Sequence, residues 1–148
     1  MRLPEFIKRK RHAADDEDSD LRLVVLSADG EFYARLEQIA AGRKWQIARA
    51  ASLEQAEALL DAEPSPLIIC EHDPEGHWRS ALRRLNVLPV KPCTLLASRV
   101  ADDYLWQEVV RNHGYDILQK LAADDQLIRS LKLAWFWSRR GRLESSEV

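Results

Sequence analysis

The chain has 148 residues, of which 46% are hydrophobic, so it is long enough for one domain with a sizeable core. Its formal net charge of −2 provides no overall basic field, so neither nucleic acid nor an anionic membrane is an expected partner. The longest apolar runs are far shorter than the roughly 20 residues of a membrane helix, and the N-terminus lacks an apolar signal core. A cytoplasmic location is therefore expected.

The two ends of the chain differ in composition from its middle. Within residues 1–20 the basic run IKRKRH is followed by the acidic run DDEDSD, and such blocks usually stay solvated. We expect a flexible N-terminal tail there, with a docking arm for a partner as the alternative. Residues 141–148 are expected to form a short C-terminal tail, which leaves a single domain at residues 21–140.

Short apolar runs and helical repeats alternate five times between the tails. Strands are expected at residues 21–27, 45–50, 67–70, 93–98 and 115–119, and helices at 31–42, 52–62, 77–88, 103–114 and 124–140. The helical stripes expected to face the core are Phe32, Leu36, Ile39 and Ala40; Ala56, Leu59 and Leu60; Trp78, Leu82 and Leu85; and Leu105, Trp106, Val109 and Val110. Five β-α units with right-handed crossovers predict an α/β fold, a doubly wound parallel sheet with helices on both faces.

The third predicted strand ends abruptly in polar residues. Its apolar run LIIC is typical of a central strand covered on both faces, and Glu71, His72 and Asp73 follow at once. Because ligands gather at the carboxyl ends of parallel strands, other residues should converge on the same edge of the sheet. These are Ser27, Ala28 and Asp29 after the first strand, Ala97 and Ser98 at the end of the fourth, and Lys120 after the fifth. Cys70 and Cys93 lie inside predicted strands without CxxC spacing, so we expect reduced core thiols.

Over roughly residues 21–139 the sequence resembles the receiver domain of two-component response regulators. RLVVLSADGEFYARL resembles the first strand and helix of that family, LIICEHDPEG the third strand and its acceptor loop, and ASRVADDYLWQEVVRNHGYDILQKL the segment from the fourth strand to the lysine-bearing turn. The resemblance implies a five-stranded flavodoxin-like sheet of strand order 2-1-3-4-5. It also implies a signalling partner, such as a histidine kinase or another regulator.

The resemblance assigns roles to the residues at this edge of the sheet. Several of these residues are not of the type that their role requires. The acidic pair that holds Mg²⁺ falls on Ser27 and Ala28, with only Asp29 beside them, and the acceptor aspartate falls on Glu71. The Thr or Ser position falls on Ala97, with Ser98 adjacent, and the lysine on Lys120. The family's proline after the lysine is Leu121 here, and its aromatic switch position is Ile117.

These departures predict a receiver-like domain without phosphorylation chemistry. Without the acidic pair the rim has too few oxygen ligands for a tight Mg²⁺ site, and the Glu71 carboxylate lies on the order of 1.5 Å further out than that of an aspartate. We therefore expect neither enzyme activity nor a cofactor. We also expect a direct ion pair between Glu71 and Lys120, and the alternative is that the two charges are solvated separately. Other readings are an intact receiver that uses Asp73 or Asp29 and a flavodoxin-like module that binds a small molecule.

Two further groups of residues invite a functional interpretation. Glu71, His72, Asp73 and His77 include possible metal ligands but follow no compact metal-binding spacing, so no metal site is expected. Tyr104, Trp106, Trp135 and Trp137 place large aromatics on the last two helices. Because Trp135 and Trp137 are two residues apart, one of them should face outward and mark an interface. The resemblance makes the face of the fourth helix, fifth strand and fifth helix the expected contact surface, for a signalling partner or a homodimer.

Overall fold

The computed structural model describes residues 20–62, 67–89 and 91–146, with side chains as far as residue 139. Its strands are β1 (Arg22–Leu26), β2 (Gln46–Ala50), β3 (Leu67–Glu71), β4 (Cys93–Ser98) and β5 (Asp116–Gln119). Its helices are α2 (Gly30–Arg43), α3 (Leu53–Ala62), α4 (His77–Asn86), α5 (Asp103–Arg111) and α6 (Asp124–Ser146). None of these helices is long and apolar enough to cross a membrane. The expected tail at residues 1–20 lies outside the described residues except for Asp20.

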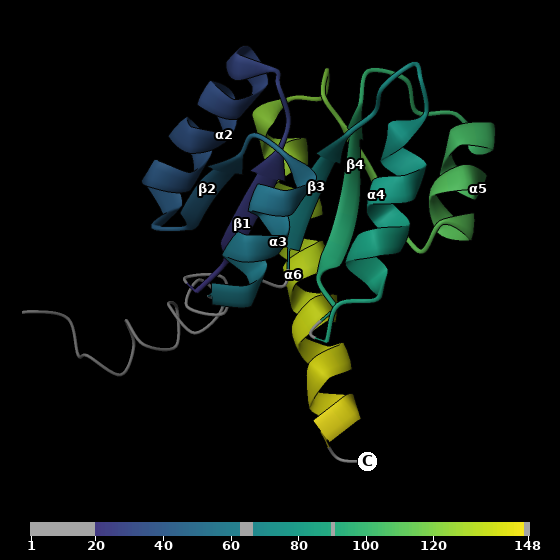
Figure 1. Ribbon diagram of the computed structural model, residues 1–148. Coiled ribbons are helices and arrows are strands. Elements are labelled where there is room, and N and C mark those ends of the chain that lie inside the picture. The colour runs from purple at the N-terminus through teal and green to yellow at the C-terminus, as the bar shows by residue number, and fades with distance from the viewer. Residues whose placement is uncertain (1–19, 63–66, 90, 147–148) are drawn as a thin grey trace, which may run out of the picture.

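The five strands form one parallel sheet in the order β2-β1-β3-β4-β5, which confirms the expected fold (Figure 1). Successive strands are added to one side of β1 as far as β2 and to the other side from β3 onwards. Ligands bind beside such a switch point, here between β1 and β3, in doubly wound folds. Each crossover is a helix, because parallel neighbours cannot be joined by a tight turn.

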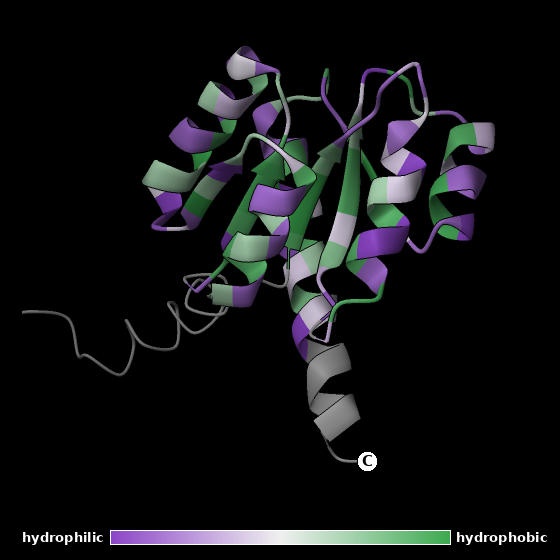
Figure 2. Cartoon of the chain, viewed as in Figure 1, coloured by the Kyte–Doolittle hydropathy of each residue, from purple (hydrophilic) through white to green (hydrophobic). Residues whose placement is uncertain are grey.

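Strand side chains alternate between two cores, one on each face of the sheet. One core joins α2 and α6 to strand residues such as Val25, Ile69 and Leu95, and the other joins α3, α4 and α5 to Val24, Ile68 and Leu96. All six of these strand residues are buried. Apolar residues therefore occupy consecutive positions in β1, β3 and β4, and Figure 2 shows these strands as hydrophobic beneath more hydrophilic outer helix faces.

The expected helical stripes are buried in α2 and α4, but α5 differs. Leu105 and Val109 face the core, whereas Trp106 and Val110 are 49% and 46% exposed, so their placement in the core was wrong. Each exposed residue follows a buried one, which turns it about 100° around the helix axis. With only nine residues, α5 buries a narrow stripe and leaves a second apolar stripe at the surface.

The last helix runs further than expected. α6 continues to Ser146, so residues 141–146 are helical although a tail was expected from residue 141. Gly141 alone does not end a helix, since glycine costs about 1 kcal/mol relative to alanine, and the arginine and leucine residues around it are good helix formers.

Candidate functional site: the rim at the carboxyl ends of the strands

Parallel register brings three strand ends together at one edge of the sheet. Leu26 lies opposite Cys70, Glu71 opposite Ala97, and Ser98 opposite Gln119. Ser27 therefore follows β1 at the level of Glu71, the last residue of β3, and Lys120 follows β5 two residues beyond that level. Of the residues expected to converge, Ser27, Asp29, Glu71 and Lys120 contact one another at this edge, which we call the rim, whereas Asp73 binds the start of α4.

Lys120 is the centre of the rim. Its ammonium group binds the Oε1 atom of Glu71, as expected, and also lies 2.5 Å from Oδ2 of Asp29. The Lys120 side chain is only 8% exposed, whereas the two carboxylates are 25% and 27% exposed. The lysine is thus enclosed between two anions that remain partly in contact with water.

Ser27 and Asp29 complete the set of contacts. Ser27 Oγ donates to Oε2 of Glu71 at 3.0 Å and accepts the backbone N–H of Asp29 at 3.0 Å. Asp29 is also the N-cap of α2, because its Oδ1 accepts the backbone N–H of Phe32 at 3.1 Å. Both oxygens of each carboxylate are consequently engaged within the protein.

The pKa values of the pair reflect this arrangement. The hydrogen bond from Lys120 and then that from the Phe32 backbone hold the pKa of Asp29 below its ordinary 3.8. Burial acts to lower the pKa of Lys120, but the bonds to Asp29 and Glu71 outweigh it and raise that pKa above its ordinary 10.5. The Lys120 ammonium also lies 5.2 Å from the centre of the Phe32 ring, a favourable cation–π distance.

Ser98 belongs to a separate pair at the rim. Its Oγ accepts the backbone N–H of Val100 at 3.0 Å and lies 3.0 Å from Nδ1 of His72. His72 in turn packs edge-on against the ring of Trp78, with ring centres 5.9 Å apart. Ser98 is 1% exposed, so its hydroxyl is held inside the protein and directed at a histidine. The adjacent Ala97 is fully buried and Ala28 is exposed, and neither side chain offers a polar atom.

Asp73 lies beyond the rim and caps the next helix. Its two oxygens accept the backbone N–H groups of His77 and Trp78, both at 2.9 Å. Burial acts to raise the pKa of Asp73, but these backbone bonds, together with the nearby His77, outweigh it, and the net effect is a lowered pKa. Ligand atoms of Asp73, Glu75 and His77 lie within 4.8 Å of one another, so this turn is where a cation could be held among the described residues. Glu75 and His77 of this group are exposed and Asp73 is partly buried.

Arg35 is a residue of the rim that the sequence did not reveal. It projects from α2 to the loop after β5, where Nη1 donates to the carbonyl of Lys120 at 2.8 Å and Nη2 to that of Ala122. Its Nε also pairs with Asp124 at 2.6 Å. In the sequence, Arg35 is only an arginine next to the apolar stripe of a predicted helix. Arginines at such positions are common on solvated helix faces, so the sequence does not indicate this role.

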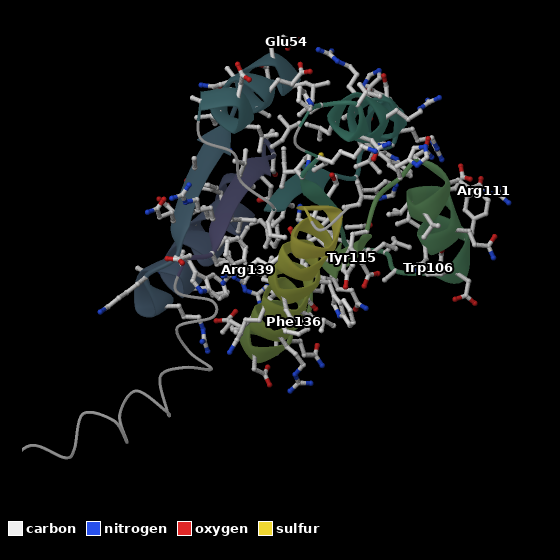
Figure 3. The ribbon with its side chains drawn as sticks, turned by 90° about the horizontal axis from the view of Figure 1, so that it is seen from below. Glu54, Trp106, Arg111, Tyr115, Phe136 and Arg139 are labelled. Carbon is white, nitrogen blue, oxygen red and sulfur yellow. The ribbon has the colours of Figure 1, made fainter. Side chains whose placement is uncertain are left out.

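The aromatic residues proposed as an interface separate into buried and exposed groups. Trp135 is 5% exposed and belongs to the core, whereas Trp137 is 50% exposed, which confirms that one of the two faces outward. Tyr104 and Trp106 on α5 are 67% and 49% exposed. In Figure 3, Trp106, Tyr115 and Phe136 lie along one side of the molecule, on α5, just before β5 and on α6.

No protein-family model and no curated protein matches the sequence. Solved structures match it in fold: the signal receiver domain of an HD domain-containing protein from Pseudomonas fluorescens Pf-5 superposes with a TM-score of 0.72 at 20% identity, over 84% of this chain and 93% of that one. A two-component response regulator from Clostridium difficile gives 0.68 at 15% identity, over 78% and 95%. A CheY-like protein, tadZ, from Pseudomonas aeruginosa PAO1 gives 0.66 at 18%, over 78% and 94%. The chain therefore has the CheY-like fold of response-regulator receiver domains.

Proposed function

We propose that this protein is a receiver-like signalling domain of a two-component or phosphorelay system that acts by protein contact and does not accept a phosphoryl group. The proposal goes beyond the fold, which the protein shares with response regulators. It depends on the residues at the rim.

The observation that carries the proposal is the double ion pair of Lys120. In a working receiver this lysine binds a phosphoryl oxygen, so its ammonium must be available when the phosphoryl group arrives. Here Lys120 is enclosed by Glu71 and Asp29, and the second oxygen of Glu71 is held by Ser27. A phosphoryl group would have to displace a carboxylate that already satisfies the lysine.

The composition of the rim also disfavours the reaction. Transfer to a carboxylate brings anions together, and a hard cation with oxygen ligands must offset their charge. Ser27 and Ala28 occupy the positions of the acidic pair, and the carboxylate of Asp29 is already bonded to Lys120 and to the start of α2. Asp73, the other acid considered as an acceptor, has both oxygens on the backbone of α4.

The same pair suggests how the domain transmits a signal without phosphorylation. Lys120 connects β5 to β3 and to the start of α2, so the loop before α6 is held in one arrangement. We infer that a signalling partner, or a second copy of the protein, reads this constant arrangement at the aromatic surface of α5, β5 and α6. The exposed Tyr104, Trp106 and Trp137 are the anchor candidates there.

Exposure to acetyl phosphate and Mg²⁺ tests the proposal directly. We expect the intact mass of the full chain to stay unchanged, under conditions in which a phosphorylatable receiver gains an acid-labile phosphoryl group. A gain of one such group that disappears in the Glu71→Gln variant would overturn the proposal, and would identify Glu71 as an acceptor.

A further inference from the structure

His72 joins two loops at the carboxyl end of the sheet. It is the first residue after β3, and its Nδ1 atom lies 3.0 Å from Oγ of Ser98, the last residue of β4. The same Oγ accepts the backbone N–H of Val100 at 3.0 Å, in the loop that leads to α5. Two successive contacts therefore connect the β3–α4 loop, through Ser98, to the β4–α5 loop.

Packing holds both partners of this contact in place. Ser98 is buried, and the backbone N–H of His72 donates to the carbonyl of Ala97 at 2.9 Å. The His72 ring also packs edge-on against the buried ring of Trp78. The imidazole therefore cannot turn away from the Ser98 hydroxyl without losing a packed neighbour.

The hydrogen-bond capacity of the hydroxyl assigns the protons in this contact. A serine hydroxyl has one proton to donate and two lone pairs to accept with. One lone pair of Ser98 accepts the Val100 N–H, and the other partner of Oγ among the described residues is His72. If Nδ1 carried a proton, the buried hydroxyl proton would have no acceptor there, which is costly. Ser98 therefore donates to Nδ1, and the proton of the neutral His72 is on Nε2.

The titratable and charged side chains on the elements around His72 are bonded to other groups or lie in water. They are Glu71 (bonded to Lys120 and Ser27), Asp73 (to the start of α4), His77 (to Asp73 and Glu75), Arg79 (to Glu108), Asp102 (to the start of α5) and the exposed Arg99. Within the part of the chain that the structure describes, no carboxylate therefore contacts the His72 ring to offset a positive charge on it.

We propose that the contact between His72 and Ser98 is a proton-sensitive latch between the two loops. Imidazole is the side chain that ordinarily changes its charge between pH 5 and 8. A protonated His72 carries hydrogen on Nδ1 and no longer accepts from Ser98, so either the ring turns towards water or the buried hydroxyl loses its acceptor. Both outcomes loosen the hold of Ser98 on Val100 in mild acid. The latch goes beyond the proposed function, because it adds an input, the proton concentration, that acts on the loop before α5.

NMR spectroscopy of the full chain tests the latch at both of its ends. At about pH 7.5 the nitrogen signals of His72 should show a proton on Nε2 and none on Nδ1. When the pH falls to about 5.5, the protection of the Val100 amide against hydrogen exchange should fall about fivefold, which is the size of one lost hydrogen bond. A proton on Nδ1 in the neutral ring, or a Val100 amide that is equally protected at both pH values, would overturn the inference.

Substitutions separate His72 from the other histidines of the described chain. His72→Phe keeps an aromatic ring against Trp78 but neither accepts a hydrogen bond nor titrates, so the Val100 amide should be weakly protected at both pH values. His77→Gln and His113→Asn are the matched controls, because both histidines are exposed and asparagine tolerates the positive φ of 70° at His113. The loss of protection in acid should persist in both controls.

The variants also state what would contradict the latch. If His72→Phe still loses protection in acid, or if either control abolishes that loss, another group senses the proton and the inference fails. The proton positions and the pH response are measured on the unmodified chain, so the test does not depend on the folding of His72→Phe. The mass measurement with acetyl phosphate is made at neutral pH and does not involve His72, so the proposed function stands or falls separately.

Discussion

Lys120 combines roles that most surface lysines do not have. Exposed ion pairs contribute little because water screens them and because ordering two long side chains costs entropy. Lys120 is 8% exposed and bonded to two carboxylates, one of which also accepts a serine hydroxyl and the other a helix N-terminus. We therefore expect its pairing to matter to stability much more than that of a surface ion pair such as Arg84 with Glu54.

Removing Lys120 should be the most costly single change at the rim. Lys120→Met leaves Glu71 and Asp29 as neighbouring uncompensated anions, and we expect a loss of about 2–3 kcal/mol of unfolding free energy, less than for a fully buried pair because both acids contact water. Glu71→Gln should cost about 1 kcal/mol, since Asp29 still neutralises the lysine. The double variant should cost less than the sum, because the second change removes a charge that the first left unpaired. Denaturant unfolding at neutral pH measures this cycle, and additive effects below about half a kcal/mol each would contradict it.

Asp29 should make stability depend on pH in acid. Its pKa is lower in the folded protein than the ordinary 3.8, so its contribution is fully present above that value and is lost as the pH falls through the folded pKa. Asp29→Asn keeps a good helix N-cap but removes the charge. Unfolding free energies at pH 5 and pH 3 should therefore fall less steeply for Asp29→Asn than for the unmodified protein. Equal slopes would show that Lys120 does not hold this carboxylate ionised.

Lys120 should make the stability of the fold depend on pH in alkaline solution. Its pKa is raised above 10.5, so its contribution is present below that value and is lost as the pH rises through the folded pKa. The Asp29–Lys120 pair therefore causes no pH dependence of the unfolding free energy near neutral pH.

Among the structural elements, the loop between β5 and α6 is held in its conformation by contacts from the neighbouring helix α2. It carries Lys120, followed by Leu121 at the position where the resemblance to receiver domains leads one to expect a proline. Arg35 on α2 binds two carbonyls of this loop and the side chain of Asp124, which fixes the loop by a planar three-contact fork. The position of Lys120 is therefore set from outside its own strand.

Replacing Arg35 by lysine tests this dependence. A lysine keeps the charge but lacks the fork, so we expect Arg35→Lys to cost about 1–2 kcal/mol in unfolding free energy. Asp124→Asn is the matched control, because that side chain is 62% exposed and its ion pair should contribute less than about 1 kcal/mol. A lysine variant as stable as the original chain would mean that the loop holds its shape unaided.

For the molecule as a whole, the fold and the chemistry of the rim are separable. The sheet has the strand order of the CheY-like fold, whereas on our proposal the groups at the strand ends are not the set that phosphorylation needs. The proposed contact surface on α5 and α6 and the rim use different residues, so a substitution in one need not alter the other.

Restoring the chemistry should require several changes at once. Glu71→Asp alone should stay unmodified by acetyl phosphate, because the oxygen ligands for Mg²⁺ are still missing. Ser27→Asp and Ala28→Asp together with Glu71→Asp form the minimum combination for which we expect a Mg²⁺-dependent gain of one phosphoryl group. Intact mass with and without Mg²⁺ measures both variants, and a gain by Glu71→Asp alone would show that Asp29 suffices as an acidic ligand.

The sequence by itself determined the alternation of strands and helices and the polar residues at the strand ends, and it predicted a Glu71–Lys120 pair with separately solvated charges as the alternative. Apolar runs and helical stripes carry that information locally, and parallel strands necessarily bring their carboxyl ends to one edge. Only the tertiary structure decided that Asp29 is a second partner of Lys120, that Ser98 turns to His72 and that Arg35 holds the loop after β5. It also placed Trp106 at the surface, where a narrow buried stripe on a short helix left it. Such pairings depend on the distance between side chains from separate elements, which periodicity along the chain does not encode.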